Sequence, residues 1–334
     1  MHFTHHMPEA VFALENVRAA ARLGRELQRG SRLPAMTKLD ASPVTVADYA
    51  CQALVSHRLV QAFPDDALVA EEDVSLLAGP AAGQVVPAVL RAMAPFEPGV
   101  TERALNSWIG LGGAVPGNRF WTLDPVDGTK GFVRGDQYVV ALALVEDRQV
   151  QVGALGCPNL TVNLQPHVAG PGCVALAVRG EGAWIAPLEQ GEMTPLYVSK
   201  RDDPALARVL RSFEDAHTDP PQLDRIFRLL GMQQEPRRMD SQAKAVVLAG
   251  GAAELVFRLL PAGRPAYREK IWDAAAGSLL VEEAGGRVTD LRGRELDFGA
   301  GRELTNNVGV VSSNGLVHEA ALAAVRAVLP EAAR

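Results

Sequence analysis

The spacing of apolar residues predicts several helices along the chain. From residue 8 to about residue 30, apolar side chains such as Leu14 and Val17 recur at the spacing of one face of an amphipathic helix. A second helix is expected over residues 45–64, where a proline stops the apolar pattern. Further helices are expected over residues 85–93, 204–209, 223–230, 242–249, 274–284 and 316–328.

Short apolar runs predict strands between these helices. The runs at residues 138–146 and 150–156 are separated by three polar residues, which is typical of a hairpin. Other strands are expected over residues 68–70, 119–124, 173–178, 182–186, 255–259 and 308–311.

The order of these elements changes along the chain. The first half mixes helices with strand pairs, an α+β pattern, whereas helices and short strands alternate in the second half, an α/β pattern. We therefore expect an N-terminal lobe of residues 1–200 and a C-terminal lobe of residues 201–334. Residues 74–118 are rich in Gly, Pro and Ala and are expected to be a variable surface insertion.

Composition narrows the classes of protein that remain. Of the 334 residues 48% are hydrophobic, which is enough for a large core. The net charge of −6, without a long basic run, disfavours a nucleic-acid polymer as partner. No apolar stretch reaches membrane-spanning length and the N-terminus lacks a signal-peptide pattern, so we expect a cytoplasmic protein without membrane contact. Cys51, Cys157 and Cys173 lack the spacing of a thiolate metal site or a disulfide framework.

Two carboxylates stand three residues apart at the end of an expected strand. The segment reads Asp124-Pro-Val-Asp127-Gly-Thr129. Pro125 fixes its own φ and removes a donor, which helps the carbonyl of Val126 to point the same way as the two acids. Carboxylate and carbonyl oxygens are ligands that Mg²⁺ prefers. Taken alone, the motif is equally consistent with an ordinary polar turn.

The spacing of these acids excludes two other uses of the motif. A phosphatase of the haloacid-dehalogenase type needs acids two residues apart, and position 126 is Val. An EF-hand loop needs three alternating acids or amides, which are absent. Asp124 is therefore interpreted as a metal ligand and not as a nucleophile that accepts a phosphoryl group.

Two further acidic features are ambiguous when each is taken by itself. Glu71 and Glu72 follow the apolar run 68–70, where they are either ligands or a solvated pair at an exposed turn. Asp273 begins an Ala-rich segment that a pair of glycines closes, and an acid there is also simply a good residue for the start of a helix.

Taken together and in order, these features resemble the lithium-sensitive inositol monophosphatase superfamily. The matching motifs are Asp124-Pro-Val-Asp-Gly-Thr-Lys-Gly-Phe132, Trp272-Asp-Ala-Ala and Ala284-Gly-Gly286. Within that superfamily the chain is more similar to the 3′(2′),5′-bisphosphate nucleotidases. That narrower likeness rests on four segments, Ser42-Pro-Val-Thr-Val-Ala-Asp-Tyr49, Phe120-Trp-Thr-Leu123 before the first motif, Gly156-Cys-Pro-Asn159 and Asp240-Ser-Gln-Ala-Lys244.

The resemblance implies a fold, a metal centre and a pair that activates water. The implied fold is a layered αβαβα sandwich of the inositol monophosphatase and fructose-1,6-bisphosphatase type. Asp48 and Thr129 match the family's pair for the attacking water, with Thr129 accepting from the water and donating to Asp48. Two or three Mg²⁺ ions are expected, held by Glu71, Asp124, the carbonyl of Val126, Asp127 and Asp273.

Anion recognition is expected at two places. The backbone amides of Gly128 and Thr129 would face the phosphate that is cleaved. Ser241, Lys244 and Arg258 would hold a second phosphate. His217 matches a histidine that contacts the nucleotide in the family, or is a surface histidine on a loop, while a second family-like histidine is replaced by Pro220.

The expected reaction is hydrolysis of the 3′-phosphate of 3′-phosphoadenosine 5′-phosphate to AMP and phosphate, with inhibition by Li⁺. The partner would be this small nucleotide, and the chain is expected to be a monomer or a homodimer. One alternative is a relative that acts on an inositol phosphate or a sugar bisphosphate. Another is a non-catalytic sensor of nucleotide bisphosphates.

Overall fold

A large sheet is built on the apolar runs of the first half of the chain. A computed structural model describes residues 7–30, 36–37, 43–75, 77, 79, 82–213, 220–261, 263–264 and 266–329. Within these ranges seven strands pair in the order β3-β4-β5-β6-β7-β8-β9, antiparallel throughout except for the parallel pair β3 and β4. The strands are β3 (Ala67–Ala70), β4 (Arg119–Asp127), β5 (Val139–Glu146), β6 (Gln149–Cys157), β7 (Cys173–Val178), β8 (Gly182–Pro187) and β9 (Thr194–Pro195).

A tight turn joins the two central strands of this sheet. Asp147 and Arg148 have φ values of 46° and 71°. Positive φ at both central positions is what a two-residue hairpin turn of type I′ requires. Gln149 already pairs with Glu146. The predicted hairpin is confirmed, with a turn of two residues in place of three.

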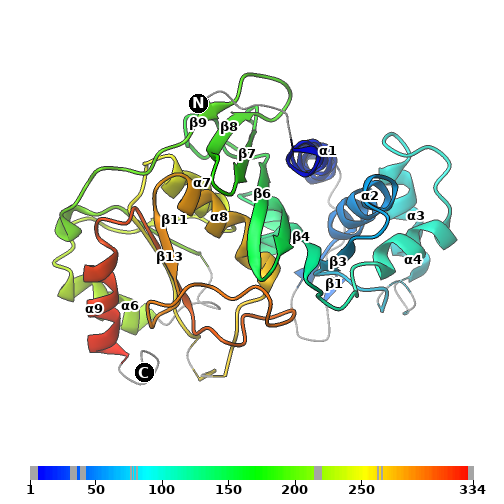
Figure 1. Cartoon of the computed structure of the whole chain (residues 1–334). Helices are drawn as coiled ribbons and strands as arrows, with labels where there is room; N and C mark the ends of the chain where they lie inside the picture. Colours follow the sequence, from blue (N-terminus) through cyan, green and yellow to red (C-terminus); the bar gives the residue numbers. More distant parts are fainter. Residues whose placement is uncertain are drawn as a thin grey trace.

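Helices cover both faces of the large sheet, as Figure 1 shows. Leu142 of β5 lies in the core that the sheet shares with α1 and α2, whereas its neighbour Ala143 lies in the core shared with α7 and α8. This alternation is expected of a strand with both faces buried. A Cβ on Gly156 would lie 2.7 Å from the carbonyl oxygen of Val17, so the glycine lets α1 pack directly on β6. The four helices are α1 (Pro8–Arg29), α2 (Val46–Ala62), α7 (Ala243–Ala249) and α8 (Ala275–Glu283).

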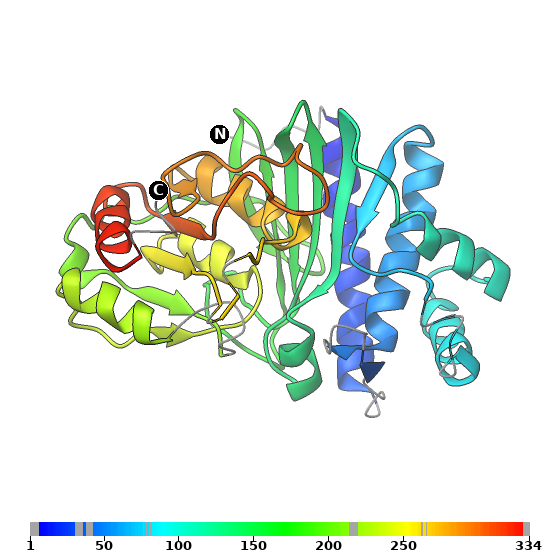
Figure 2. The same cartoon turned by 90° about the horizontal axis from the view of Figure 1, so that it is seen from below.

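A second, smaller sheet completes the layers. Its described strands follow the order β11-β10-β12-β14-β13; β10 is parallel to both of its neighbours, and β14 is antiparallel to both β12 and β13. α7 and α8 lie between the two sheets, while α6 and α9 cover the outer face of the small one (Figure 2). The predicted αβαβα sandwich is confirmed. The elements are β10 (Val209–Arg211), β11 (Arg237–Arg238), β12 (Leu255–Arg258), β13 (Arg287–Thr289), β14 (Val310–Ser313), α6 (Pro220–Leu229) and α9 (His318–Val328).

The helix predicted over residues 204–209 is wrong. Asp203 accepts a hydrogen bond from the amide of Ala205 and closes a single 3₁₀ turn, η1 (Pro204–Leu206). The chain then becomes extended, because Val209 pairs with Leu255 of β12. Val209, the last residue of the predicted helix, instead begins the strand β10, and sheet pairing overrides the local pattern.

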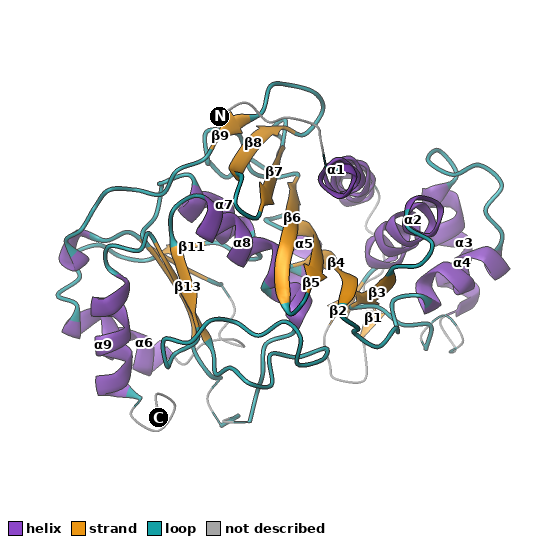
Figure 3. Ribbon diagram, in the orientation of Figure 1, coloured by secondary structure: helices purple, strands orange, loops and turns teal. Residues whose placement is uncertain are grey.

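The insertion predicted over residues 74–118 carries more ordered structure than expected. It holds α3 (Ala82–Met93) and a helix that the sequence pattern missed, α4 (Glu102–Gly110). Thr101 caps α4 by accepting from the amide of Ala104. Both helices pack their apolar side against α2, beyond the large sheet (Figure 3). The sequence pattern did not predict α4, because this helix is short and has few buried residues, chiefly Leu105 and Ile109.

The remaining described elements are short and lie close to the ends of larger ones. No helix in the described part of the chain combines the length and apolar character needed to cross a membrane. All strands of the large sheet precede those of the small sheet, and α8 packs on both, so two separate lobes at residues 1–200 and 201–334 stay a prediction. The short elements are β1 (Met36–Thr37), β2 (Pro43–Val44), α5 (Thr129–Arg134) and η3 (Ile271–Asp273).

His318 at the start of α9 makes the stability of the small sheet depend on pH. Its ring is buried and contacts the hydroxyls of Thr289 and Ser313 at 2.9 and 2.8 Å. Burial and then the nearby Arg287 lower its pKa to about 4. As the pH falls below the ordinary histidine pKa of about 6.5, the unfolded chain gains a proton that the folded chain does not.

We therefore expect the free energy of unfolding to fall between pH 7 and pH 5 more steeply in the wild type than in His318→Gln. The difference should be about 1 kcal/mol over that interval. Urea denaturation of both proteins at pH 7, 6 and 5 measures it. Parallel pH profiles would contradict the assignment of a neutral buried ring.

Candidate metal centre

The end of β4 exposes oxygen atoms because its ladder is interrupted. Asp124 pairs with Ala141 of β5, but Asp127 pairs with Val139, so three steps on β4 match two on β5. Such a bulge bends the strand and re-aims its side chains. Pro125 has no amide to donate to the ladder, and the Asp124 carboxylate accepts from the amide of Val126 at 3.1 Å.

Four acids meet at this bulge from three separate segments. Carboxylate oxygens of Asp124, Asp127 and Asp273 lie within 4.8 Å of one another. Glu71 directly follows β3, where its amide donates to the carbonyl of Leu123 at 3.1 Å. The Glu71 carboxyl also shares a hydrogen bond with Asp124. The structure thus brings together the acids that the sequence motifs separate by up to 202 residues, from position 71 to position 273.

Burial and mutual repulsion raise the pKa values of the three aspartates. Burial is the largest cause for Asp124, whose pKa is raised well above its usual value, and the charges of Glu71, Asp127 and Asp273 add to it. Burial and then Asp273 raise the pKa of Asp127 to about 6. Burial also raises the pKa of Asp273, although Arg258 opposes the shift. Carboxylates held this way disfavour their own ionised forms.

The donor set fits a hard divalent cation. Every side chain in the cluster offers a carboxylate oxygen as a metal ligand, and the carbonyl oxygen of Val126 lies on the same bulge. Oxygen ligands of this kind suit Mg²⁺ and similar ions, and a bound cation would remove the repulsion that raises the pKa values. Glu71, Asp124, Asp127 and Asp273 would hold it.

The predicted pair Asp48 and Thr129 also meets at this place. Asp48 is fully buried at the start of α2, where one carboxylate oxygen accepts from the amide and the hydroxyl of Thr45, both at 2.7 Å. The Thr129 hydroxyl lies 3.4 Å from the other oxygen and 3.1 Å from the Val126 carbonyl. The capping contacts therefore fix Asp48 with one oxygen facing Thr129.

Ser241 and Lys244 lie next to the cluster, at the turn before α7. Ser241 has a φ of 63°, and a Cβ on Gly128 would lie 3.1 Å from the Ser241 Cβ, so only glycine lets the two turns approach. The Lys244 amine donates to the carbonyls of Met239 and Ser241 and to the hydroxyl of Ser212, at 3.1, 2.9 and 3.2 Å. Burial, then Arg258, lowers its pKa to about 8.

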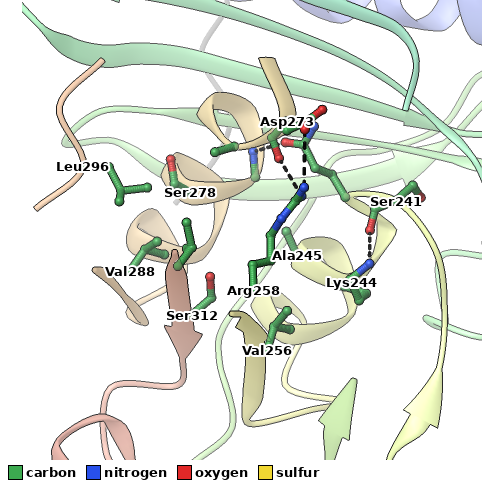
Figure 4. Close-up of a pocket in the computed structure, with 14 residues that line it drawn as sticks. Ser241, Lys244, Ala245, Val256, Arg258, Asp273, Ser278, Val288, Leu296 and Ser312 are labelled. Carbon is green, nitrogen blue, oxygen red and sulfur yellow. Dashed lines mark hydrogen bonds and ion pairs between the residues drawn. The ribbon is translucent and has the colours of Figure 1, made fainter. Parts of the chain in front are cut away.

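Arg258 is bound to acids. Its guanidinium lies 2.7 Å from a Glu269 oxygen and 3.3 Å from an Asp273 oxygen, contacts that Figure 4 shows for Asp273. A cavity of about 50 Å³ lies beside it, with Lys244 and Asp273 at one side and Val256 among the apolar residues opposite. That volume holds a few water molecules and not a nucleoside. Contact of Ser241, Lys244 and Arg258 with a second phosphate stays a prediction.

Sequence reasoning missed two residues that hold the cluster. The Gln242 amide donates to Asp127 at 2.5 Å, and the Gln242 side chain donates to the carbonyl of Trp272 and accepts from the amide of Gly277, both at 3.0 Å. Glu269 forms an ion pair with Arg258, which also pairs with Asp273. The only signal for Gln242 was its place inside the motif at 240–244, and Glu269 had none.

Two other predicted positions have different outcomes. Glu72 is only 2% exposed, and its amide donates to the side chain of Gln52 at 3.1 Å, so the alternative of a solvated acidic pair is wrong for it. His217 lies outside the described residues, and its contact with a nucleotide stays a prediction.

Fold and site together define a class, that of layered αβαβα proteins with a carboxylate centre between their two sheets. A family model, the inositol monophosphatase family, matches residues 8–329. The chain belongs to this family, as its motifs predicted. The 3′(2′),5′-bisphosphate nucleotidase of Schizosaccharomyces pombe is 37% identical, covering 96% of this chain and 95% of its own. The 3′,5′-bisphosphate nucleotidase AHL of Arabidopsis thaliana is 40% identical, covering 94% and 95%.

Solved structures support the fold independently. The IMPase of Thermotoga maritima superposes with a TM-score of 0.65 at 23% identity, over 98% of this chain and all of that one. SuhB of Mycobacterium tuberculosis gives a TM-score of 0.62 at 18% identity, over 98% of each chain. At these identities the likeness concerns the fold alone.

The carboxylate of Asp124 should lower the free energy of unfolding when no cation is bound. We expect Asp124→Asn to raise the free energy of unfolding in EDTA by about 1 kcal/mol, because it removes one of four repelling carboxylates. The gain in melting temperature that MgCl₂ gives the wild type should be lost in the variant. Thermal melts with EDTA and with MgCl₂ measure both effects.

Asp290→Asn is the matched comparison. Asp290 is equally buried but pairs with Arg294 at 2.8 Å and accepts from two backbone amides. The same substitution should therefore destabilise the protein by about 3 kcal/mol with or without MgCl₂. An Asp124→Asn protein that loses stability in EDTA as Asp290→Asn does would contradict a cation site at the bulge.

Proposed function

We propose that this chain is a Mg²⁺-dependent phosphatase that removes the 3′-phosphate of 3′-phosphoadenosine 5′-phosphate, giving AMP and phosphate. The observation that carries the proposal is the meeting of Glu71, Asp124, Asp127 and Asp273 beside the pair Asp48 and Thr129. Membership of the inositol monophosphatase family agrees with this chemistry.

The chain's own residues account for the activation of water. The Thr129 hydroxyl has a single proton and lies within reach of the buried Asp48 carboxylate. When that proton points to Asp48, the Thr129 oxygen can accept a hydrogen bond from the attacking water. As the water attacks phosphorus, its proton passes to Thr129 while the Thr129 proton passes to Asp48. No covalent phosphoenzyme is required.

The acids at the bulge supply the sites for the cations. Bound divalent cations lower the pKa of water and neutralise charge on the phosphoryl and leaving oxygens. Glu71, Asp124 and Asp127 would orient them at the ends of β3 and β4, and Asp273 would close the site from η3. The carbonyl of Val126 would add an uncharged ligand. We propose two or three such ions and inhibition by Li⁺, on the likeness to a lithium-sensitive family.

The choice of substrate rests on the relatives and on the cationic side of the site. Three relatives that are 37%, 40% and 37% identical to this chain are named bisphosphate nucleotidases. Lys244 and Arg258 place two positive charges beside Asp273, where a second phosphate would gain from them. The amides of Gly128 and Thr129 would face the phosphate that is cleaved. A cytoplasmic location and a monomer or homodimer remain predictions from the sequence.

Two other functions remain to be compared. A relative acting on an inositol phosphate or a sugar bisphosphate would use the same acids, because the metal ligands do not contact the leaving alcohol. A nucleotide sensor without activity is disfavoured by the pair Asp48 and Thr129, since binding alone has no use for a proton acceptor beside the acids.

Phosphate release from a substrate panel tests the reaction. In MgCl₂ we expect the adenosine 3′,5′-bisphosphate to be hydrolysed at least tenfold faster than inositol 1-phosphate or fructose 1,6-bisphosphate. EDTA should abolish release, and millimolar LiCl should inhibit it. Preference for either competitor would refute the nucleotide, and calorimetric binding of the bisphosphate without phosphate release would favour the sensor.

Thr129→Val tests the role of the hydroxyl. Because it removes the group that accepts from water, we expect kcat to fall at least about 100-fold with little change in KM. Thr122→Val, on the strand β4 that leads to Thr129, is the matched control. The Thr122 hydroxyl is buried without a hydrogen-bond partner among the described residues, so its removal should leave kcat unchanged. Equal activities of the two variants would refute the proposed pair.

A further inference from the structure

The metal centre is assembled from the end of β3, the bulge in β4 and the segment η3, so something must set the distance between these segments. Glu71 follows β3 of the large sheet, whereas Asp273 ends η3, which lies after β12 of the small sheet. Like charges on Glu71, Asp124 and Asp273 push these segments apart when no cation is bound. A fixed separation therefore needs a contact that joins the two sides.

The segment around Arg302 lies directly beside the chain that leads to Asp273. The carbonyl of Arg302 accepts from the amide of Ile271 at 3.2 Å, and the amide of Leu304 donates to the carbonyl of Glu269 at 2.9 Å. Between these bonds Lys270 and Glu303 form an antiparallel bridge. The backbone of residues 302–304 thus moves with the backbone of residues 269–271.

The side chain of Arg302 crosses from this segment to the end of β3. Its guanidinium donates to the carbonyl of Gly112 at 2.9 Å and to the carbonyl of Ala70, the residue before Glu71. The same guanidinium lies 4.8 Å from the ring centroid of Trp272, the residue before Asp273. One planar group therefore touches the immediate neighbours of two predicted metal ligands.

We propose that Arg302 is a positioning residue that sets the separation of Glu71 and Asp273, and through it the affinity for the divalent cation. This inference rests on the metal centre of the proposed function. Within the described part of the chain the guanidinium has no carboxylate partner at ion-pair distance. Two of its nitrogens donate hydrogen bonds to backbone carbonyls. Its planar fork spans two carbonyls at once, which a lysine ammonium cannot match.

Titration of Mg²⁺ into the substrate-free protein tests the proposal. Groups that orient metal ligands typically change metal affinity by 10- to 100-fold. We expect Arg302→Gln to weaken Mg²⁺ binding by about tenfold in calorimetry. The substrate KM measured at saturating Mg²⁺ should stay unchanged, because Arg302 touches neither water nor phosphate in the proposed reaction.

Arg148→Gln is the matched control, because Arg148 also holds the segment that carries Arg302. Arg148 pairs with Asp297, which ties the other end of the 297–302 segment to the turn between β5 and β6. The loss of this exposed contact should change the melting temperature only slightly, while Mg²⁺ affinity stays at the wild-type value. Mg²⁺ affinity of Arg302→Gln within twofold of the wild type would overturn the proposal.

Arg302→Lys separates geometry from charge and serves if Arg302→Gln does not fold. It keeps the charge but loses the fork, so Mg²⁺ binding should remain several-fold weaker than in the wild type. Full recovery of affinity in Arg302→Lys would also overturn the proposal. A wild type that binds Mg²⁺ but does not hydrolyse the bisphosphate would refute the proposed reaction alone, whereas a wild type that binds no Mg²⁺ would refute both.

Discussion

The repulsion among Glu71, Asp124, Asp127 and Asp273 is the constraint on which the rest of the structure depends. The backbone of three separate segments forces these acids close together, and burial removes the water that would screen them. A protein can hold such a cluster only if rigid elements on every side resist its expansion. The two sheets and the helices between them supply that rigidity, because both of their faces are packed.

Several contacts oppose this repulsion without neutralising it. Arg258 places its charge beside Asp273 but shares it with Glu269, so the cluster keeps an excess of negative charge. On the side of α7, Lys244 and the amide of Gln242 stabilise the ionised form of Asp127 and so limit the rise in its pKa. The protein thus relieves the repulsion only in part, and in the proposed function a bound cation would relieve the rest.

The start of α2 fixes one member of the proposed catalytic pair. Asp48 is the N3 partner of Thr45 in the capping box of α2, and its other carboxylate oxygen faces Thr129. Its geometry is therefore secured by the helix that packs on the large sheet, and Thr129 begins α5 immediately after the bulge in β4. The proposed water-activating pair and the proposed metal ligands thus meet at the same strand end.

The sequence by itself determined the family, the layered fold and the candidate acids, because these depend on local patterns. The hairpin at 138–156 and the helices at 8–30 and 45–64 follow from periodicity and turn chemistry. The motifs around Asp124 and Asp273 point to oxygen ligands, because their spacing at strand and helix ends is itself the chemical signal.

Only the tertiary structure decided which strands pair and which residues hold the predicted metal ligands in place. The segment predicted as a helix over 204–209 is a 3₁₀ turn that leads into the strand β10, because the pairing of Val209 with Leu255 is not visible in a local pattern. The roles of Gln242 and Arg302 were equally invisible, since they act through backbone carbonyls and amides that carry no sequence identity. A motif records what a residue is, whereas the distance between two motifs is set by packing.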